Sequence, residues 1–234
     1  MKKLLFALSI VFALVSCGGR NAEPAPRRVK MQTTMGDIVL ELSNHTPIHR
    51  DNFMQLVEEG YFDSLLFHRV SENFMIQGGD PRTRDISGKE FFADGEETGD
   101  ARYWEDIPAE IIFPTLYHKR GVLAAAREGD DVNPQRRSSR TQFYIVWGRT
   151  FDDAGLDAQQ QRITRSTGGK VILPDSIREV YKTVGGTPHL DGQYTVFGHV
   201  VSGLDVVDKI QRTPTDSLDR PIEDVRIISA KEIK

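Results

Sequence analysis

Short segments rich in β-forming residues, separated by turns, recur along this chain of 234 residues. They cover residues 65–80, 121–126, 142–147, 194–201 and 224–230. The 20 glycines and 11 prolines provide many places at which a chain can turn, which favours short strands over a helical bundle. The pattern predicts an all-β, or mainly β, fold in which the strands form a sandwich or a barrel.

The start of the folded part is predicted to be a β-hairpin followed by a helix. Apolar and polar residues alternate over 29–33, and after a turn a second apolar run covers 38–42. Thr46–Pro47 resembles a helix cap followed by a proline at the first helical position, and Gly60 is expected to end that helix. A second amphipathic helix is expected after residues 202–205, which resemble a capping box.

The N-terminus has the composition of a signal peptide. Two lysines at 2–3 precede an apolar run over 4–15, which is too short to span a bilayer comfortably. Residues 1–16 are therefore predicted to be a signal peptide. Leu14–Cys17 also resembles a bacterial lipobox, in which Cys17 becomes the lipidated first residue of the mature chain. The alternative is that Cys17 merely lies near an ordinary cleavage site.

Cys17 is the only cysteine, so neither an internal disulfide nor a catalytic thiol is expected. Residues 17–28 are interpreted as the lipidated cysteine and a flexible tether, because they lack apolar periodicity. The folded domain is predicted to cover 29–234. We expect a lipid anchor in the bacterial cell envelope. No acidic run follows Cys17, which favours the periplasm over the cell surface.

The segment Phe67–Asp80 has the most distinctive chemistry. It places the guanidinium of Arg69 among large apolar side chains and follows them with the amide of Gln77 and a double glycine. An arginine keeps its charge in proteins, so Arg69 is excluded as a general base and offers a rigid fork of donors. An apolar pocket with one fixed donor suits the binding and polarising of a neutral group. The alternative is a surface arginine on a strand.

Four segments of recognisable composition follow one another in the chain: Phe67–Asp80, Gly121–Arg127, Thr141–Ile145 and Leu190–Gly198. In this order they closely resemble the signature segments of the cyclophilins, a family of peptidyl-prolyl isomerases. Any one segment alone would be only suggestive, whereas the four together are spread over most of residues 31–234. The resemblance implies an eight-stranded antiparallel closed β-barrel capped at its ends by two α-helices.

The resemblance implies a peptidyl-prolyl cis–trans isomerase that needs no cofactor and no metal. Rotation about an X-Pro bond is slow because it breaks amide resonance, at a barrier of roughly 18–20 kcal/mol. When the amide twists, the prolyl nitrogen regains a lone pair, and a fixed cationic donor in a water-poor pocket stabilises that state preferentially. Arg69 matches this donor, and Gln77 matches the pocket glutamine that orients the substrate carbonyl or the arginine.

Further residues match the family's substrate-binding positions: Phe74, Met75, Ala126, Arg127, Gln142, Tyr144, His189, Leu190 and Tyr194. Without the family, each apolar member of this set would more often be ordinary core. Phe143, next to Tyr144, is expected to point into the core because side chains alternate along a strand.

Four positions depart from residues that are frequent in the family. His189 stands where many cyclophilins have tryptophan, which predicts weaker cyclosporin binding. Tyr194 replaces a histidine common in eukaryotic members, and Arg127 replaces a frequent asparagine. Tyr144 replaces a frequent phenylalanine and adds a hydroxyl that needs a partner. None of these changes removes Arg69, so activity with an altered substrate preference is expected.

Two segments look like insertions relative to compact cyclophilins, one at about 81–110 and one at about 151–188. The first is polar and acidic but lacks the spacing of a calcium loop. The second contains a helical apolar pattern stopped by Gly185–Gly186, so at least one helix is expected there. Because it precedes the 189–197 segment directly, it is a candidate border of the substrate groove.

Two classes of function compete. The first is an isomerase that acts, as a monomer, on proline-containing unfolded or extended polypeptides among exported proteins. The second is a peptide-binding or chaperone module in which catalysis is incidental, with a purely structural lipoprotein as a more distant alternative. Retention of Arg69, Phe74, Met75 and Gln77 together favours the enzyme, since binding alone would not require that set.

Charge and spacing argue against two further kinds of site. The net charge of −4 does not favour nucleic acid as a partner. His45 and His49 lie four residues apart, but Pro47 separates them and no third ligand is apparent, so no metal site is predicted.

Overall fold

The computed structural model describes residues 25–84 and 100–234. The predicted signal peptide, Cys17 and most of the tether lie outside the described residues, as does most of the acidic part of the 81–110 segment. Within the part of the chain that is described, no helix is both long and apolar enough to cross a membrane.

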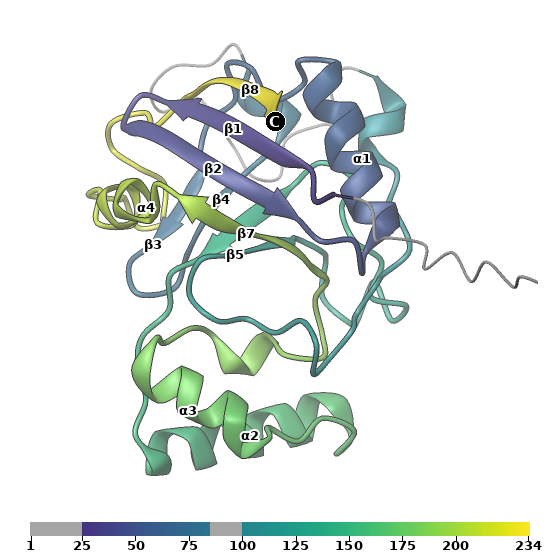
Figure 1. Ribbon diagram of the computed structural model, residues 1–234, viewed down its shortest axis with the longest axis vertical. Helices are drawn as coiled ribbons and strands as arrows, with labels where there is room; N and C mark the ends of the chain where they lie inside the picture. Colours follow the sequence, from purple (N-terminus) through teal and green to yellow (C-terminus); the bar gives the residue numbers. More distant parts are fainter. Residues whose placement is uncertain (1–24, 85–99) are drawn as a thin grey trace, which may run out of the picture.

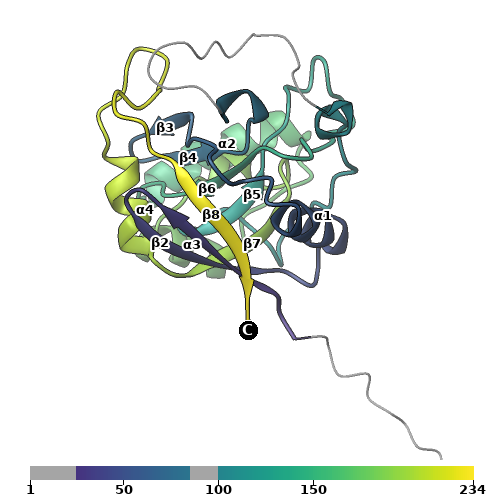
Figure 2. The same cartoon turned by 90° about the horizontal axis from the view of Figure 1, so that it is seen from above.

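An antiparallel sheet of eight strands forms the body of the described chain (Figure 1). Its strands are β1 (Arg28–Thr33), β2 (Gly36–Leu42), β3 (Arg69–Ser71), β4 (Met75–Gly78), β5 (Val122–Ala125), β6 (Phe143–Val146), β7 (Val196–Ser202) and β8 (Ile227–Ile233). They lie in the order β3-β4-β6-β5-β7-β2-β1-β8. The predicted hairpin is confirmed as β1 and β2, and the start of β1 lies beside the end of β8 (Figure 2).

The predicted closed barrel is not confirmed, because the edge strands β3 and β8 do not pair with each other as strands. Instead, the segment before β3 approaches the start of β8 through a few main-chain hydrogen bonds. The N–H of Ser64 donates to the carbonyl of Ile227 (2.8 Å), and that of Phe67 donates to the carbonyl of Val225 (2.9 Å). Strand β3 has three residues and is too short to continue this pairing. The sheet is therefore a half-barrel.

Two helices pack against the half-barrel on different sides, as expected (Figure 1). Helix α1 (Pro47–Glu58) buries Phe53, whose ring centroid lies 4.7 Å from that of Phe62 and 5.5 Å from that of Phe197. Helix α4 (Leu204–Gln211) buries Val207 and Ile210 in the same core. Aromatic and branched side chains from the sheet and both helices thus fill the inside of the half-barrel.

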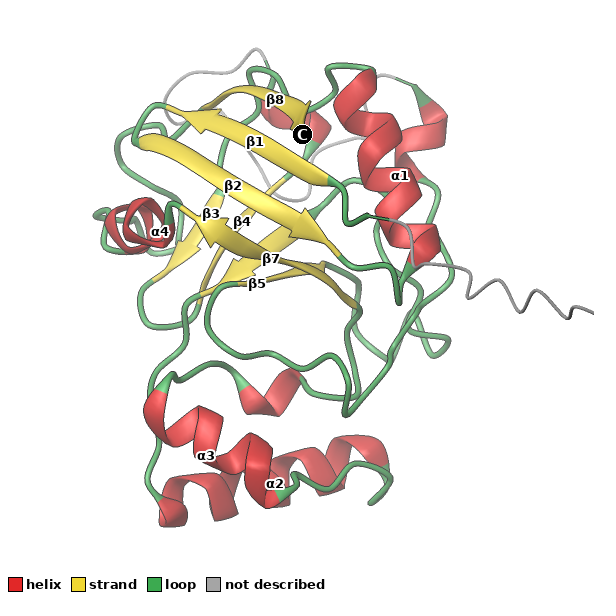
Figure 3. Ribbon diagram, viewed as in Figure 1, coloured by secondary structure: helices red, strands yellow, loops and turns green. Residues whose placement is uncertain are grey.

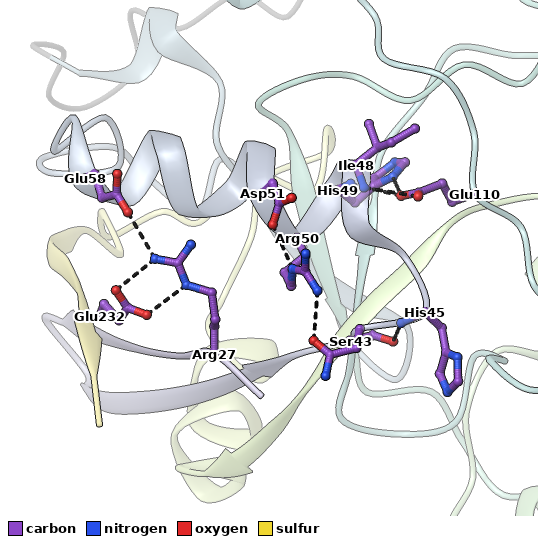
Figure 4. Close-up of polar contacts among 11 residues, drawn as sticks. Arg27, Ser43, His45, Ile48, His49, Arg50, Asp51, Glu58, Glu110 and Glu232 are labelled. Carbon is purple, nitrogen blue, oxygen red and sulfur yellow. Dashed lines mark hydrogen bonds and ion pairs between the residues drawn. The ribbon is translucent and has the colours of Figure 1, made fainter. Parts of the chain in front are cut away.

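Helix α1 begins at Pro47 as predicted, but its cap comes from a distant residue. The hydroxyl of Thr46 is buried without a hydrogen-bond partner in the described chain. Glu110 instead accepts hydrogen bonds from the main-chain N–H groups of Ile48 (3.1 Å) and His49 (2.9 Å), and from Nδ1 of His49 (2.7 Å) (Figure 4). A carboxylate at this end of a helix also complements the helix dipole.

Helix α4 begins at Leu204, but the predicted capping box is wrong. The N-cap residue is Gly203, in the left-handed region at φ +86°, and no side chain caps the helix. A Cβ atom on Gly203 would lie 2.2 Å from the carbonyl oxygen of Asp37. The start of α4 therefore approaches β2 too closely for any residue with a side chain.

The helix predicted within 151–188 is present, and a second one accompanies it. These are α2 (Asp153–Thr167) and α3 (Asp175–Thr183), and α3 ends just before the glycine pair, as predicted. They lie below the half-barrel in Figures 1 and 3, against the short 3₁₀ helix η3 (Pro188–Leu190). Their buried residues form a small separate core: Leu156, Ile163, Val171, Leu173, Ile177 and Tyr181. The 81–110 segment contributes the short 3₁₀ turns η1 (Pro81–Thr83) and η2 (Ala101–Trp104).

Candidate active site

The pairing register of neighbouring strands brings several predicted site residues into one row. Arg69 on β3 pairs with Gln77 on β4, Gln77 pairs with Tyr144 on β6, and Tyr144 pairs with Ala124 on β5. Directly paired residues project from the same face of a sheet. The residues adjacent to this row in the chain face the main core instead: Val70, Ile76, Phe143 and Ile145. The predicted core position of Phe143 is thus confirmed.

A second apolar cluster covers this face of the sheet. Its buried members are Met75, Val122, Ala124, Tyr144, Val146, Leu190 and Val196. Beside it is a hollow of about 210 Å³, lined by Arg69, Phe74, Met75, Gln77, Ala126, Arg127, Tyr144, Leu190 and Tyr194. The structure therefore brings nearly all the predicted pocket residues together, and only Gln142 and His189 do not line the hollow.

Those two residues contact the lining from behind. The side-chain amide of Gln77 donates to the amide oxygen of Gln142 (3.0 Å). The amide nitrogen of Gln142 in turn lies 3.3 Å from the carboxylate of Asp80. The ring of His189 stacks on that of Phe74, with centroids 5.6 Å apart. Burial, helped by nearby positive charges, lowers the pKa of His189 to about 4, so this ring is neutral near pH 7.

Arg69 lies at the open mouth of the hollow. Its side chain is 44% exposed, and its Nε atom lies 3.4 Å from a carboxylate oxygen of Asp219. Its guanidinium carbon lies 6.0 Å from the centroid of the Phe74 ring. Arg69 is thus partly open to solvent, and the water-poor surroundings expected for its catalytic contact stay a prediction. Phe67 and Ile76, close to it in the sequence, point into the core on the other face of the sheet.

The loop that carries Asp219 is attached to β3. The main-chain N–H of Val70 donates to the carbonyl of Asp219 (2.7 Å), and Asp219 itself has a positive φ of 63°. The main-chain bond between Val70 and Asp219 therefore holds the carboxylate of Asp219 beside Arg69. It is the only ion-pair partner of Arg69 within the described residues.

The sequence that forms these strands and the hollow matches a known family. The family model described as "Cyclophilin type peptidyl-prolyl cis-trans isomerase/CLD" matches residues 28–232. This chain belongs to the cyclophilin family. It is accordingly a peptidyl-prolyl cis–trans isomerase, as the resemblance of its four segments implied.

Relatives extend over nearly the whole domain. The chain is 31% identical to "Peptidyl-prolyl cis-trans isomerase-like 1" of Gibberella zeae, over 88% of this chain and 94% of that relative. It is 34% identical to a Streptococcus pyogenes protein whose name combines a phosphatase with a peptidyl-prolyl cis–trans isomerase, over 86% of this chain but only 37% of that longer protein. A crystal structure of a Cryptosporidium parvum cyclophilin shares the fold, with a TM-score of 0.59 and 24% identity over 89% of this chain and 98% of that chain.

Two of the residues that depart from the usual family pattern are held by neighbours around the pocket of this cyclophilin. The hydroxyl of Tyr144 lies 2.9 Å from Nε2 of His118, so the partner expected for it is present. The guanidinium of Arg127 lies over the ring of Tyr194, 4.4 Å from its centroid. Its side chain is 3% exposed and also forms an ion pair with Asp130 at 2.7 Å. Arg127 thus forms part of the wall with most of its donors already in use.

Sequence reasoning missed three residues that contact the lining or support a residue that does. His118 and Asp219 lie outside the four matching segments, and Asp191 lies inside one of them but was given no role. Each acts through a contact with a residue far away in the chain; His118 and Asp191, for example, are 73 positions apart. Nothing in the local pattern around any of the three indicates its partner.

The described residues contain no group of three or more histidine, cysteine or acidic side chains placed to hold a metal ion. His49 is bonded to Glu110, and His45 points away from that contact (Figure 4). A larger hollow, of about 520 Å³, lies beside β2 and β7 and is lined in part by Glu41, His45 and His199. It contains none of the predicted pocket residues.

Proposed function

We propose that this cyclophilin accelerates X-Pro rotation by stabilising the twisted amide with the guanidinium of Arg69. The observation that carries the proposal is the position of Arg69 in the same row as Gln77 and Tyr144, at the mouth of an apolar hollow. Its one described carboxylate partner is 3.4 Å away, so most of its donors are available to a bound peptide.

Binding of the proline ring is the first step. The hollow of about 210 Å³ offers the apolar surfaces of Phe74, Met75 and Leu190, with the ring of Tyr144 among them. Burying an apolar ring there is favourable and needs no charge. Once seated, the proline is fixed while the part of the peptide preceding it stays outside and is free to rotate.

Stabilisation of the transition state is the second step. As the amide twists, the prolyl nitrogen becomes a better acceptor, and the N–H groups of Arg69 donate to it. Arg69 is 44% exposed, so the bound peptide itself has to exclude water from this contact. Exclusion of water lowers the local dielectric and strengthens the hydrogen bond at the moment it is needed.

Gln77 orients the reacting groups. Its amide nitrogen is used by Gln142, which leaves its amide oxygen as an acceptor without a partner among the described residues. That oxygen accepts from a peptide N–H or from Arg69 itself, and in either case it restricts the bound geometry. Ala126 and Arg127 line the same hollow and provide the wall along which the extended peptide lies.

Arg69→Ala is the decisive variant, assayed as the rate of cis–trans isomerisation of a short X-Pro peptide. We expect kcat/KM to fall at least tenfold, about 1.4 kcal/mol of transition-state stabilisation. Arg28→Ala is a matched control, because Arg28 also lies on a strand, is 46% exposed and pairs with one carboxylate, that of Glu41. Unchanged kcat/KM in a folded Arg69→Ala protein would contradict the role of Arg69.

The second part of the proposal concerns location. We propose that Cys17 carries a lipid anchor and that the enzyme acts on exported proteins in a bacterial envelope. The signal-peptide pattern of residues 1–16 supports this. The chain leaves the domain at Arg27, which binds Glu58 (3.0 Å) and Glu232 (2.8 Å) and so fixes the point where the tether starts (Figure 4).

Fractionation of cells that express the full chain tests the anchor. The wild type should be found with the membranes, and Cys17→Ala should not. Mass spectrometry of the N-terminal peptide should show acyl chains on Cys17. Equal membrane association of both proteins would refute the anchor and leave the catalytic proposal untouched.

A further inference from the structure

We infer that Tyr181, on helix α3, is a positioning residue of the isomerase: through Asp191 and His118 it fixes the hydroxyl, and with it the ring, of Tyr144 in the proline pocket. We call these four residues the floor chain. The inference rests on the proposed pocket, and it gives the segment 151–188 a role in catalysis although no residue of α2 or α3 lines the hollow.

Short hydrogen bonds connect the four residues in series. The hydroxyl of Tyr181 donates to one carboxylate oxygen of Asp191 (2.7 Å). The other oxygen lies 2.9 Å from Nδ1 of His118 and also accepts from the main-chain N–H of His118 (2.8 Å). On the far side of the imidazole, Nε2 lies 2.9 Å from the hydroxyl of Tyr144. The series thus runs from the small core of α2 and α3 to the pocket.

The floor chain is closed to water. Tyr181 and Asp191 are 0% exposed, His118 is 1% exposed and Tyr144 is 5% exposed. Buried polar groups need partners, and here each hydroxyl and ring nitrogen has one. Burial raises the pKa of Tyr181 and of Tyr144 well above the ordinary value, so both hydroxyls keep their protons and can donate.

The proton positions in the floor chain follow from the carboxylate of Asp191, which accepts from both sides. A carboxylate only accepts, so Nδ1 of His118 must carry a proton and donate to Asp191. In the neutral imidazole Nε2 is then an acceptor, and the hydroxyl of Tyr144 must donate to it. With every donor and acceptor assigned, Tyr144 has a single favoured hydroxyl direction, away from the proline pocket.

The hydroxyl contact decides how the ring of Tyr144 lies. His118 and Tyr144 are nearly parallel, at 12° with centroids 6.1 Å apart, and Tyr194 meets both rings edge-on at 84°. A ring fixed at its hydroxyl end cannot tilt into the hollow. A phenylalanine at the same place would be held by packing alone.

The contact between Tyr181 and Asp191 also holds the other side of the pocket. Asp191 directly follows Leu190, the member of η3 that lines the hollow. The one carboxylate therefore sets both the placement of Leu190 and the orientation of Tyr144. Tyr181 supplies one of its three donors, and it is the donor that comes from the helical segment 151–188.

A double-substitution cycle separates positioning from a general structural role. We expect Tyr181→Phe to lower kcat/KM for an X-Pro peptide about three- to tenfold, mainly through a higher KM. In the Tyr144→Phe background the same substitution should change kcat/KM clearly less, by under about twofold, because no hydroxyl is left to position and only the placement of Leu190 can still respond. Equal losses in both backgrounds, or no loss in the wild-type background, would overturn the inference.

Tyr117→Phe is the matched control. Tyr117 packs against Tyr181 edge-on, with centroids 5.8 Å apart, but its hydroxyl forms no hydrogen bond within the described residues. Its loss should leave kcat/KM unchanged in both backgrounds. A fall as large as that of Tyr181→Phe would show that any disturbance of this small core reaches the pocket, which also overturns the inference.

A measurement on the wild type keeps the test valid if a variant does not fold. The ¹⁵N shifts of the neutral His118 imidazole should show a protonated Nδ1 and an accepting Nε2, and the opposite tautomer would overturn the inference. The outcome is also distinguishable from failure of the proposed site. If Arg69→Ala lowers kcat/KM as expected while the tyrosine cycle is additive, only the role of the floor chain is refuted.

Discussion

The mouth and the floor of the pocket are held in opposite ways. At the mouth, Arg69 is half-exposed and has one carboxylate near it at 3.4 Å, while Gln77 keeps an acceptor oxygen without a partner in the described chain. At the floor, the four members of the floor chain are buried and joined by contacts of 2.7–2.9 Å. The same small hollow thus combines a loosely held cation with a rigidly bonded ring.

The difference matches the two tasks of the catalyst. A donor that has to follow a nitrogen whose lone pair appears during the reaction needs free hydrogen-bonding capacity. A surface that has to recognise the shape of a proline ring needs a fixed position, which buried hydrogen bonds provide. Substitutions at the mouth should therefore change the rate with little effect on stability, whereas substitutions in the floor chain should change both.

Asp191→Ala should have the largest effect on stability. It removes the acceptor of three buried donors, and an uncompensated buried network of this kind costs about 3–5 kcal/mol. Urea denaturation measures the loss, with Asp219→Ala at the mouth as the comparison. Asp219 is 40% exposed, so its removal should cost about 1 kcal/mol or less. Similar losses for the two variants would remove the distinction between mouth and floor.

His189 stacks on Phe74 in the pocket wall and should make stability depend on pH. Its pKa is about 4 in the folded protein against an unfolded value of 6.5, so below pH 6.5 the unfolded state binds the proton first. The stability that this residue contributes is present above pH 6.5 and is lost as the pH falls towards 4, up to about 3 kcal/mol.

His189→Phe should retain the stack on Phe74 and reduce this pH dependence. The free energy of unfolding, measured in urea at pH 7 and at pH 4.5, gives the slope for each protein. Burial also lowers the pKa of His68 and His49, so the wild type has other contributions to its slope, and only the difference between the two proteins isolates His189. Equal slopes would show that His189 titrates normally in the folded state.

Arg69→Lys comes next and tests whether charge alone is sufficient at the mouth. Lysine keeps the positive charge but has no planar fork, and its ammonium group is more strongly hydrated. We expect kcat/KM to fall about tenfold, while the free energy of unfolding changes by less than about 0.5 kcal/mol. Full activity with lysine would mean that a mobile positive charge is enough and that the geometry of the guanidinium is unimportant.

Periodic patterns within short stretches of sequence predicted strands and helices correctly, although the predicted caps of α1 and α4 did not hold. Alternation gave the β1–β2 hairpin and the opposite faces of Phe143 and Tyr144, and the spacing of Ile177 and Tyr181 gave helix α3. These succeed because periodicity reports directly which side of an element is buried. The closed barrel came from the resemblance, and it is not confirmed, because β3 has only three residues with which to pair.

Contacts between residues far apart in the chain could not be predicted from the sequence. Glu110 caps helix α1 from 62 positions away, where the pattern indicated Thr46, and no periodicity links the two segments. The resemblance supplied Arg69, Gln77 and the apolar lining. It did not predict the floor chain, because the role of Tyr181 depends on its hydrogen bond to Asp191, which forms only in the folded structure.

Asp219→Asn should give the smallest effect and refines the description of the mouth. Asparagine keeps the shape of the loop and its main-chain bond to Val70 but removes the charge 3.4 Å from Arg69. An exposed pair of this kind contributes about 0–1 kcal/mol, so stability should hardly change and kcat/KM should change less than about threefold.

The informative measurement is kcat/KM at low and high salt, because screening weakens the pair only where the carboxylate is present. If Asp219 merely holds Arg69 near the hollow, the wild type should lose activity in salt and Asp219→Asn should not. A tenfold or greater loss in Asp219→Asn would instead mean that the mouth is as tightly organised as the floor.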